Sequence, residues 1–217
     1  MQISDYVIQG DLEAYSCKLA GTDKKLSRSL EQEVLNDLAT SPPGVADTLS
    51  ASPVGPLSES ASRRPLIYLI LTLNHMYPDF DFSTLRAQNF TKEGGVSIVK
   101  NNIDNLLMEC GKTWRPQAQS DTNKSFLEAM WAAINEVIEL GESDVYSYNS
   151  DLEGDPFGEE GSIWSFNYFF YNRRLKRVVY FSCRCFANSM MPCMINGNGD
   201  NEEEYWDDED PADDMDL

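Results

Sequence analysis

Four basic residues between two aromatic runs are the feature of this chain best suited to recognise another molecule. The stretch Trp164 to Cys185 reads WSFNYFFYNRRLKRVVYFSCRC. Its alternating aromatic residues predict two strands, because successive strand side chains point to opposite faces of a sheet. We expect the turn near Asn172-Arg173, since Asn tolerates the positive φ that a tight hairpin needs. The basic residues at the tip of this predicted hairpin are Arg173, Arg174, Lys176 and Arg177.

Three interpretations of this basic cluster are open. It could be a solvated turn, because Arg and Lys commonly border hairpins. It could dock on an acidic protein surface, or on the chain's own acidic tail, since the planar Arg fork binds carboxylates in pairs. The third interpretation, nucleic-acid binding, is the weakest, because four bases do not dominate the field of a chain with a formal charge of −19.

Residues that could perform catalysis are few. The single histidine, His75, lies inside an apolar segment and has no evident relay partner in sequence, so a structural role is expected. Cys183 and Cys185 share one face of a predicted strand and are expected to be packed thiols. The five cysteines contain no C-x-x-C pair, which argues against a paired zinc site.

The acidic loop before the hairpin resembles the start of a calcium loop only superficially. Asp151, Glu153 and Asp155 alternate, but the sixth and twelfth positions are Pro156 and Ser162 instead of Gly and Glu. No Gly-rich phosphate loop is present. We therefore expect no catalytic residue, no cofactor, no metal and no enzymatic activity.

Acidic residues are concentrated at the C-terminal end. Asp200 to Leu217 holds eleven acids and no Lys or Arg, which leaves 25 acids and 17 bases in the remainder. This balance argues against direct nucleic-acid binding, whose affinity depends on phosphate neutralisation. The longest apolar run, Leu66 to Leu73, is far shorter than the roughly 20 residues of a membrane helix, so no membrane association is expected.

Composition predicts one folded domain interrupted by a linker. Residues 40–63, rich in Ser, Pro and Gly, are expected to be a mobile linker. Residues 1–39 and 64–193 are expected to form a single α+β domain, and 194–217 a disordered acidic tail. An antiparallel sheet flanked by helices is predicted. Its strands are Val7–Leu19, with a bulge near Tyr15, Asp144–Asn149 and the two strands of the hairpin. The helices are Asp23–Ala39 with Asp23 as N-cap, a segment from Pro65 onward that could also be a buried strand, Val96–Cys110, and Leu127–Ile138 stopped by Gly141.

Three serines are candidates for phosphorylation. Ser41 and Ser52 each precede a proline in the predicted linker, and Ser27 follows Lys24-Lys25-Leu26, a spacing that basophilic kinases read. Phosphate adds nearly two negative charges and can switch docking. An unmodified spacer is the alternative for the linker.

Three segments resemble one protein family. The stretch YSYNSDLEGDPFGEEGSIWSFNYFFYNRRLKRVVYFSCR closely resembles the C-terminal signature block of the Maf-type repressors of RNA polymerase III. LEAYSCKLAGTDKK resembles the N-terminal box of that family, and YLILTLNHMYPDFDFS the segment after its mobile loop. The resemblance covers about Leu12 to Arg184.

The resemblance implies a eukaryotic regulator without catalytic activity. Family members bind RNA polymerase III near its clamp and block its recruitment by initiation factors at tRNA, 5S and other small-RNA genes. Kinases and phosphatases linked to nutrients and growth control them, and location is divided between nucleus and cytoplasm. The family fold is an antiparallel sheet flanked by helices. This chain has no convincing basic nuclear-localisation run in the linker, because Arg63-Arg64 is too short.

We expect the hairpin cations to contact the polymerase, together with residues of the loop that precedes the hairpin. The rival hypothesis is a nucleic-acid platform in which Trp164, Tyr168 and Phe170 stack on bases. The loop residues expected to join the protein contact are Asp151, Asp155, Phe157 and Glu159.

Overall fold

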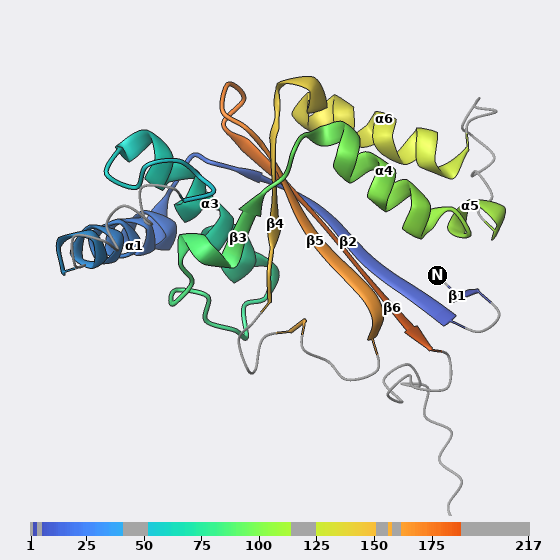
Figure 1. The fold of residues 1–217 in the computed structure, drawn as a ribbon, viewed down its shortest axis with the longest axis horizontal. Helices are drawn as coiled ribbons and strands as arrows, with labels where there is room; N and C mark the ends of the chain where they lie inside the picture. The colour runs from blue at the N-terminus through green and yellow to red at the C-terminus, as the bar shows by residue number, and fades with distance from the viewer. Residues whose placement is uncertain are drawn as a thin grey trace, which may run out of the picture.

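A six-stranded antiparallel sheet forms the centre of the computed structural model, in the order β1-β2-β6-β5-β4-β3 (Figure 1). The structure describes residues 2–3, 6–40, 52–113, 125–150, 156–157 and 162–187. β2 pairs with β6 along its whole length, although some 160 residues separate them in sequence. The strands are β1 (Gln2–Ile3), β2 (Tyr6–Ser16), β3 (Phe90–Lys92), β4 (Asp144–Tyr148), β5 (Ser162–Asn172) and β6 (Arg177–Ala187).

Helices cover both faces of the sheet. α1 and α3 pack on one face, and α4, α5 and α6 pack on the other (Figure 1). Two short 3₁₀ turns, η1 (Ala87–Asn89) and η2 (Leu140–Glu142), precede β3 and β4. The helices are α1 (Gly21–Thr40), α3 (Ser60–Met76), α4 (Val96–Leu107), α5 (Cys110–Thr113) and α6 (Phe126–Ile138).

The aromatic alternation of β5 and β6 supplies both cores. Phe169 and Tyr180 point to the α3 side, with ring centroids 4.9 Å apart. Phe170 and Phe181 point to the α6 side, where both meet the edge of Trp131. Because a strand shows successive side chains to opposite faces, a hairpin apolar on both faces requires a layer of helices on each side.

Helix α3 is buried almost all round because it lies between the sheet and α1. Leu66, Leu69 and Leu73 have no exposed surface. Tyr180, buried beneath this helix, keeps its hydroxyl satisfied by donating to Asn167 Oδ1 at 2.7 Å. No buried polar side-chain atom in the described ranges lacks a hydrogen-bond partner.

The predicted α+β class and its antiparallel sheet flanked by helices are confirmed, and so is the helical form of the segment after Pro65. Several boundaries differ. β2 ends at Ser16 and pairs with β6 without a bulge at Tyr15. α1 begins before Asp23, so Asp23 is not its N-cap. α6 ends at Ile138 and is capped by Glu139, whose φ of 53° is left-handed, rather than stopped by Gly141. β1, β3 and α5, which are two to four residues long, were not predicted.

The structure also differs from the prediction in the second half of the expected linker. Residues 52–63 pack on the domain: Val54 and Leu57 are buried, and α3 begins at Ser60 instead of Pro65. Arg63 explains part of this order, because its buried guanidinium donates to Leu57 O at 2.9 Å and pairs with Glu31. Residues 41–51 and the predicted acidic tail, 194–217, lie outside the described residues.

Candidate interaction surface

The predicted hairpin forms, but its tip differs from the expected tight turn. Arg173–Lys176 make a four-residue connection between β5 and β6, and the positive φ of 51° belongs to Lys176, not to Asn172. Asn172 is instead fully buried. Its Nδ2 donates to Ile138 O at 2.9 Å, and its Oδ1 accepts from the Leu175 amide at 2.9 Å. This side chain therefore fixes the tip to the end of α6.

Two of the tip cations point to the C-terminal end of α6. Arg177 Nη1 donates to Val137 O at 2.7 Å, and Arg174 forms an ion pair with Glu139. The last carbonyls of a helix lack intrahelical partners and carry partial negative charge, so cations are favoured there. α6 has no basic residue in its own last turn, and the hairpin supplies the missing charge.

The other two tip cations face the opposite side of the hairpin, where α3 begins. Arg173 Nη2 approaches Ala61 O at 3.4 Å. In a regular helix Ala61 O would accept from residue 65, but Pro65 has no N–H, so this carbonyl is free for another donor. Lys176 is held near the end of β2, because its carbonyl accepts from the Cys17 amide at 2.9 Å.

These contacts enclose a pocket of about 330 Å³, which we call the cationic pocket. Its four basic side chains come from three separate parts of the chain: the second residue after β2, the first turns of α3 and the hairpin tip. No carboxylate lies among its lining residues. The pocket is lined by Lys18, Arg64, Arg173 and Lys176, together with Cys17, Ala61, Tyr68 and Tyr171.

None of the four pocket cations has a carboxylate within ion-pair distance in the part of the chain that the structure describes. Elsewhere Arg63 pairs with Glu31 at 3.2 Å and Arg86 with Asp37 at 2.7 Å. Burial raises the pKa of the Cys17 thiol to about 12, and burial also raises the pKa of the Tyr171 phenol. Both groups are therefore neutral at pH 7, and the charge that lines the pocket is entirely positive.

The described residues of the predicted contact loop, 156–157, do not adjoin the hairpin tip. Ser162, where β5 begins, lies at the opposite end of this eleven-residue strand from the tip, roughly 35 Å away at about 3.3 Å per residue (Figure 1). Phe157 is only 8% exposed and packs on Tyr77 and Tyr148, with ring centroids 5.1 and 5.4 Å away. Its prediction as a surface contact is therefore wrong; Asp151, Asp155 and Glu159 lie outside the described residues.

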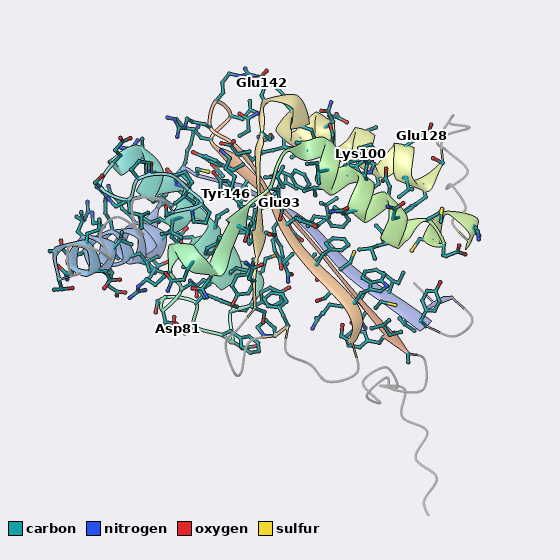
Figure 2. All side chains as sticks on the ribbon, in the orientation of Figure 1. Asp81, Glu93, Lys100, Glu128, Glu142 and Tyr146 are labelled. Atoms are coloured by element: carbon teal, nitrogen blue, oxygen red, sulfur yellow. The ribbon has the colours of Figure 1, made fainter. Side chains whose placement is uncertain are left out.

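The hairpin tip and Phe157 lie at different ends of the molecule. Glu142, the last residue of η2 before β4, lies at the upper end of the molecule in Figure 2, where the hairpin tip also lies. Phe157 follows Pro156, whose carbonyl accepts from Arg184 Nη1 at 2.7 Å, and Arg184 lies in the part of β6 that is remote from the tip. The tip cations and Phe157 thus belong to opposite ends of the sheet.

The aromatic platform of the rival hypothesis is part of the core. Phe170 has no exposed surface, and Trp131 covers it at a centroid distance of 6.2 Å. Trp164 and Tyr168 are half-buried against the same cluster. A ring that stacks on a base needs an open face, which Phe170 lacks, so the three residues together do not form the predicted platform.

The remaining candidate residues lie apart from the pocket's cations. His75 is half-exposed, stacks on Tyr15 and pairs with Asp23 at 3.2 Å. Cys183 and Cys185 are buried as predicted, and burial raises the pKa of the Cys183 thiol to about 12, which suppresses the nucleophilic thiolate. Across the described ranges, no three His, Cys, Asp or Glu side chains are arranged to hold a metal ion. None of the helices there combines the length and apolar character that crossing a membrane requires.

The phosphorylation candidates differ in their surroundings. Ser27 is half-buried in the middle of α1. Ser52 lies in a turn, where its hydroxyl donates to Gly55 O at 2.5 Å. Ser41 lies outside the described residues. A kinase needs the backbone around Ser27 or Ser52 to open locally, because both are held in hydrogen-bonded structure.

Sequence reasoning missed half of the cationic pocket. Lys18 and Tyr68 lie inside two of the segments that carry the family resemblance, but nothing there marks them as site residues, and Arg64 stands out only as part of a short basic pair. Lys18 reaches the tip because β2 pairs with β6 in the register Ser16↔Arg177. That long-range register was the signal needed to find the site, and no local pattern contains it.

Fold and surface together define an α+β domain whose exposed chemical groups are suited to binding. The model of the Maf1 regulator family matches residues 8–182, and the chain belongs to this family. A Dictyostelium discoideum protein named as a repressor of RNA polymerase III transcription is 31% identical over 99% of this chain and 87% of its own length. A Schizosaccharomyces pombe protein of the same description is 33% identical over 91% of this chain and 81% of its own. The crystal structure of citrus MAF1 superposes with a TM-score of 0.68 at 43% identity, covering 87% of this chain and 94% of that one.

Replacing Asn172 tests how firmly the tip is attached. We expect Asn172→Ala to lower the free energy of unfolding by roughly 1–3 kcal/mol, because the Leu175 amide loses its acceptor at a buried side chain. Urea unfolding followed by circular dichroism measures the change. Asn105→Ala, on the exposed side of α4, is the control and should change the free energy by less than about 0.5 kcal/mol. Equal changes in the free energy of unfolding of the two variants would show that Asn172 does not hold the tip on α6.

Proposed function

We propose that this protein represses transcription by RNA polymerase III. The observation that carries the proposal is membership of the Maf1 regulator family along residues 8–182, together with relatives named as repressors of this transcription. The identities of 31% and 33% extend over nearly the whole chain, so the likeness is not limited to one motif.

The repressor acts by binding the polymerase near its clamp and blocking its recruitment by initiation factors. The contact surface includes the hairpin tip, with Arg173, Arg174, Lys176 and Arg177. Their exposure supports this assignment, as does the rigid attachment of the tip to α6, because an ordered surface loses less entropy on binding than a mobile one. Asp151, Asp155 and Glu159 of the loop before β5 belong to the same proposed contact.

Phosphorylation controls the repressor, which is distributed between nucleus and cytoplasm and meets its kinases and phosphatases there. Ser27, Ser41 and Ser52 are the proposed sites. The Ser-Pro pairs and the Lys-Lys-Leu-Ser pattern support these sites, because each is a residue pattern that kinases read. Added phosphate lowers the affinity for the polymerase by placing negative charge on an already acidic protein.

Reconstituted transcription tests the repressor function directly. Purified protein added to RNA polymerase III, its initiation factors and a tRNA gene should reduce transcript yield in a saturable, concentration-dependent manner. The same protein should leave a promoter of RNA polymerase II unaffected. Undiminished tRNA synthesis at micromolar repressor would refute the proposed function.

Charge reversal tests the contribution of the hairpin tip to polymerase binding. Arg173→Glu with Arg174→Glu should weaken pull-down of the polymerase at least tenfold, since like charges would replace attractive ones at an acidic contact. Folding should persist, because Arg174 and Glu139 are both largely exposed and such a pair contributes about 0–1 kcal/mol. Circular dichroism and the melting temperature verify this.

The control carries the same change in charge elsewhere. Lys24→Glu with Lys25→Glu alters two exposed residues of α1 and should leave pull-down within about twofold of the original protein. Equal losses in the two variants would attribute the effect to net charge. Unchanged binding in the tip variant would exclude the tip from the contact.

Phosphopeptide mapping tests the proposed regulation. In protein isolated from growing cells, we expect phosphate on at least one of Ser27, Ser41 and Ser52, and less of it after nutrient withdrawal. Mass spectrometry of digested protein measures the occupancy of each serine. Full absence of phosphate from all three under both conditions would exclude these sites.

A further inference from the structure

We propose that the cationic pocket binds the phosphate group of a phosphate monoester or a small phosphorylated molecule. The pocket holds Lys18, Arg64, Arg173 and Lys176, which is four of the seventeen basic residues of a chain that has thirty-six acidic ones. Phosphate monoesters carry nearly two negative charges at pH 7 and several acceptor oxygens, which matches a site made only of donors.

The convergence of these cations is not compensated by ion pairs among the described residues. Each is exposed, and none has an ion pair with a described carboxylate, whereas Arg63, Arg86 and Arg174 all do. Four like charges around one pocket repel one another, and their repulsion is relieved only by screening or by a bound anion. The protein therefore retains an arrangement that favours an anionic ligand.

Neutral donors lie deeper in the same pocket. Tyr68 is half-buried and Tyr171 is buried, and their ring centroids are 6.0 Å apart. Burial raises the pKa of both phenols, so both hydroxyls keep the proton that a phosphate oxygen would accept. Arg173 partly opposes the rise in the pKa of the Tyr171 phenol, so its charge at the rim acts on the floor of the pocket.

The N-terminal end of helix α3 also favours an anion in the pocket. Ala61, in its first turn, lines the pocket, and the helix is seventeen residues long. The N-terminal end of a helix carries partial positive charge and favours anions. Arg64 lies in the same part of the helix, so the side chain and the helix end act in the same direction.

The size of the pocket favours a single phosphate group over a nucleic acid. A volume of about 330 Å³ lies at the lower end of the roughly 300–1,000 Å³ of small-molecule sites. A long polyanion would extend from the pocket over the surface of a chain with a charge of −19 and would be repelled there. A small anion interacts mainly with the four cations close to it, because charges beyond about 8 Å are screened at physiological salt.

This inference is independent of the proposed function, because it concerns the isolated protein, although Arg173 and Lys176 belong to both sites. The phosphate could belong to a free phosphorylated molecule or to a phosphoserine of a peptide. The chemistry recognised is the same in both cases, and separate probes distinguish the two sources.

Calorimetric titration of the full chain with pyrophosphate, at an ionic strength held constant with sodium chloride, tests the pocket. We expect saturable binding and a melting temperature that rises with pyrophosphate concentration, since a ligand specific for the folded state stabilises it. Lys18→Gln with Arg64→Gln should weaken binding at least tenfold, because charge-assisted hydrogen bonds are lost. These two residues are outside the proposed polymerase contact, so repression should be kept.

The matched control removes two charges outside the pocket. Lys24→Gln with Lys25→Gln should bind pyrophosphate as the original protein does. A second probe, a peptide of residues 36–46 with phosphoserine at Ser41, is compared with its unphosphorylated form. Binding of pyrophosphate alone assigns the site to free phosphorylated molecules, and binding of the phosphopeptide but not its unphosphorylated form extends it to phosphoserine.

Three results would overturn the proposal. The first is the absence of saturable binding of either phosphorylated probe at 10 mM, a concentration about a hundredfold above a moderate affinity of roughly 0.1 mM. The second is equal weakening in the pocket variant and the control variant. The third is binding of a twelve-nucleotide single strand more tightly than pyrophosphate, which would indicate a nucleic-acid surface. Amide NMR spectra confirm that each variant is folded before the comparison is made.

Discussion

The β5–β6 hairpin is buried on both faces, and the rest of the structure depends on this constraint. Phe169 and Tyr180 require a cover on one side, and Phe170 and Phe181 require one on the other. α3 and α6 provide these covers. Because both faces are occupied, the strands have almost no room for charge, and four of the five basic residues of the hairpin are placed at its tip.

At the tip the hairpin meets two helix ends of opposite polarity. Arg174 and Arg177 reach the C-terminal end of α6, where unpaired carbonyls favour cations. Arg173 and Lys176 face the beginning of α3, whose positive end does not neutralise them. Alternation along the hairpin thus divides four similar residues into two that stabilise the fold and two whose charge remains available to a ligand. Pro65 contributes to the position of Arg173. Because Pro65 has no N–H, the Ala61 carbonyl is free to accept from Arg173.

Local patterns predicted the elements well, and long-range contacts account for most of the differences. The period of the apolar residues placed α4, α6 and β4 close to their observed bounds, since each pattern reports the face that its element buries. The start of α3 was misplaced because Pro65 resembles a first helical residue, whereas the helix begins earlier through contacts of Arg63 with Leu57 and Glu31. The acidic neighbours of Phe157 favour a surface position, but Tyr77 and Tyr148 cover it from distant segments.

The same reasoning explains why net charge was an incomplete guide to the candidate site. A charge of −19 describes the whole chain and argues correctly against a polyanionic partner that spreads over the surface. It does not describe the potential inside a pocket, since screening limits each charge to a neighbourhood of about 8 Å. Lys18 enters that neighbourhood only through the pairing of β2 with β6, and Arg64 only through the packing of α3. A site of one sign on a protein of the other is therefore a product of topology, and it becomes visible only when the strands are placed in register.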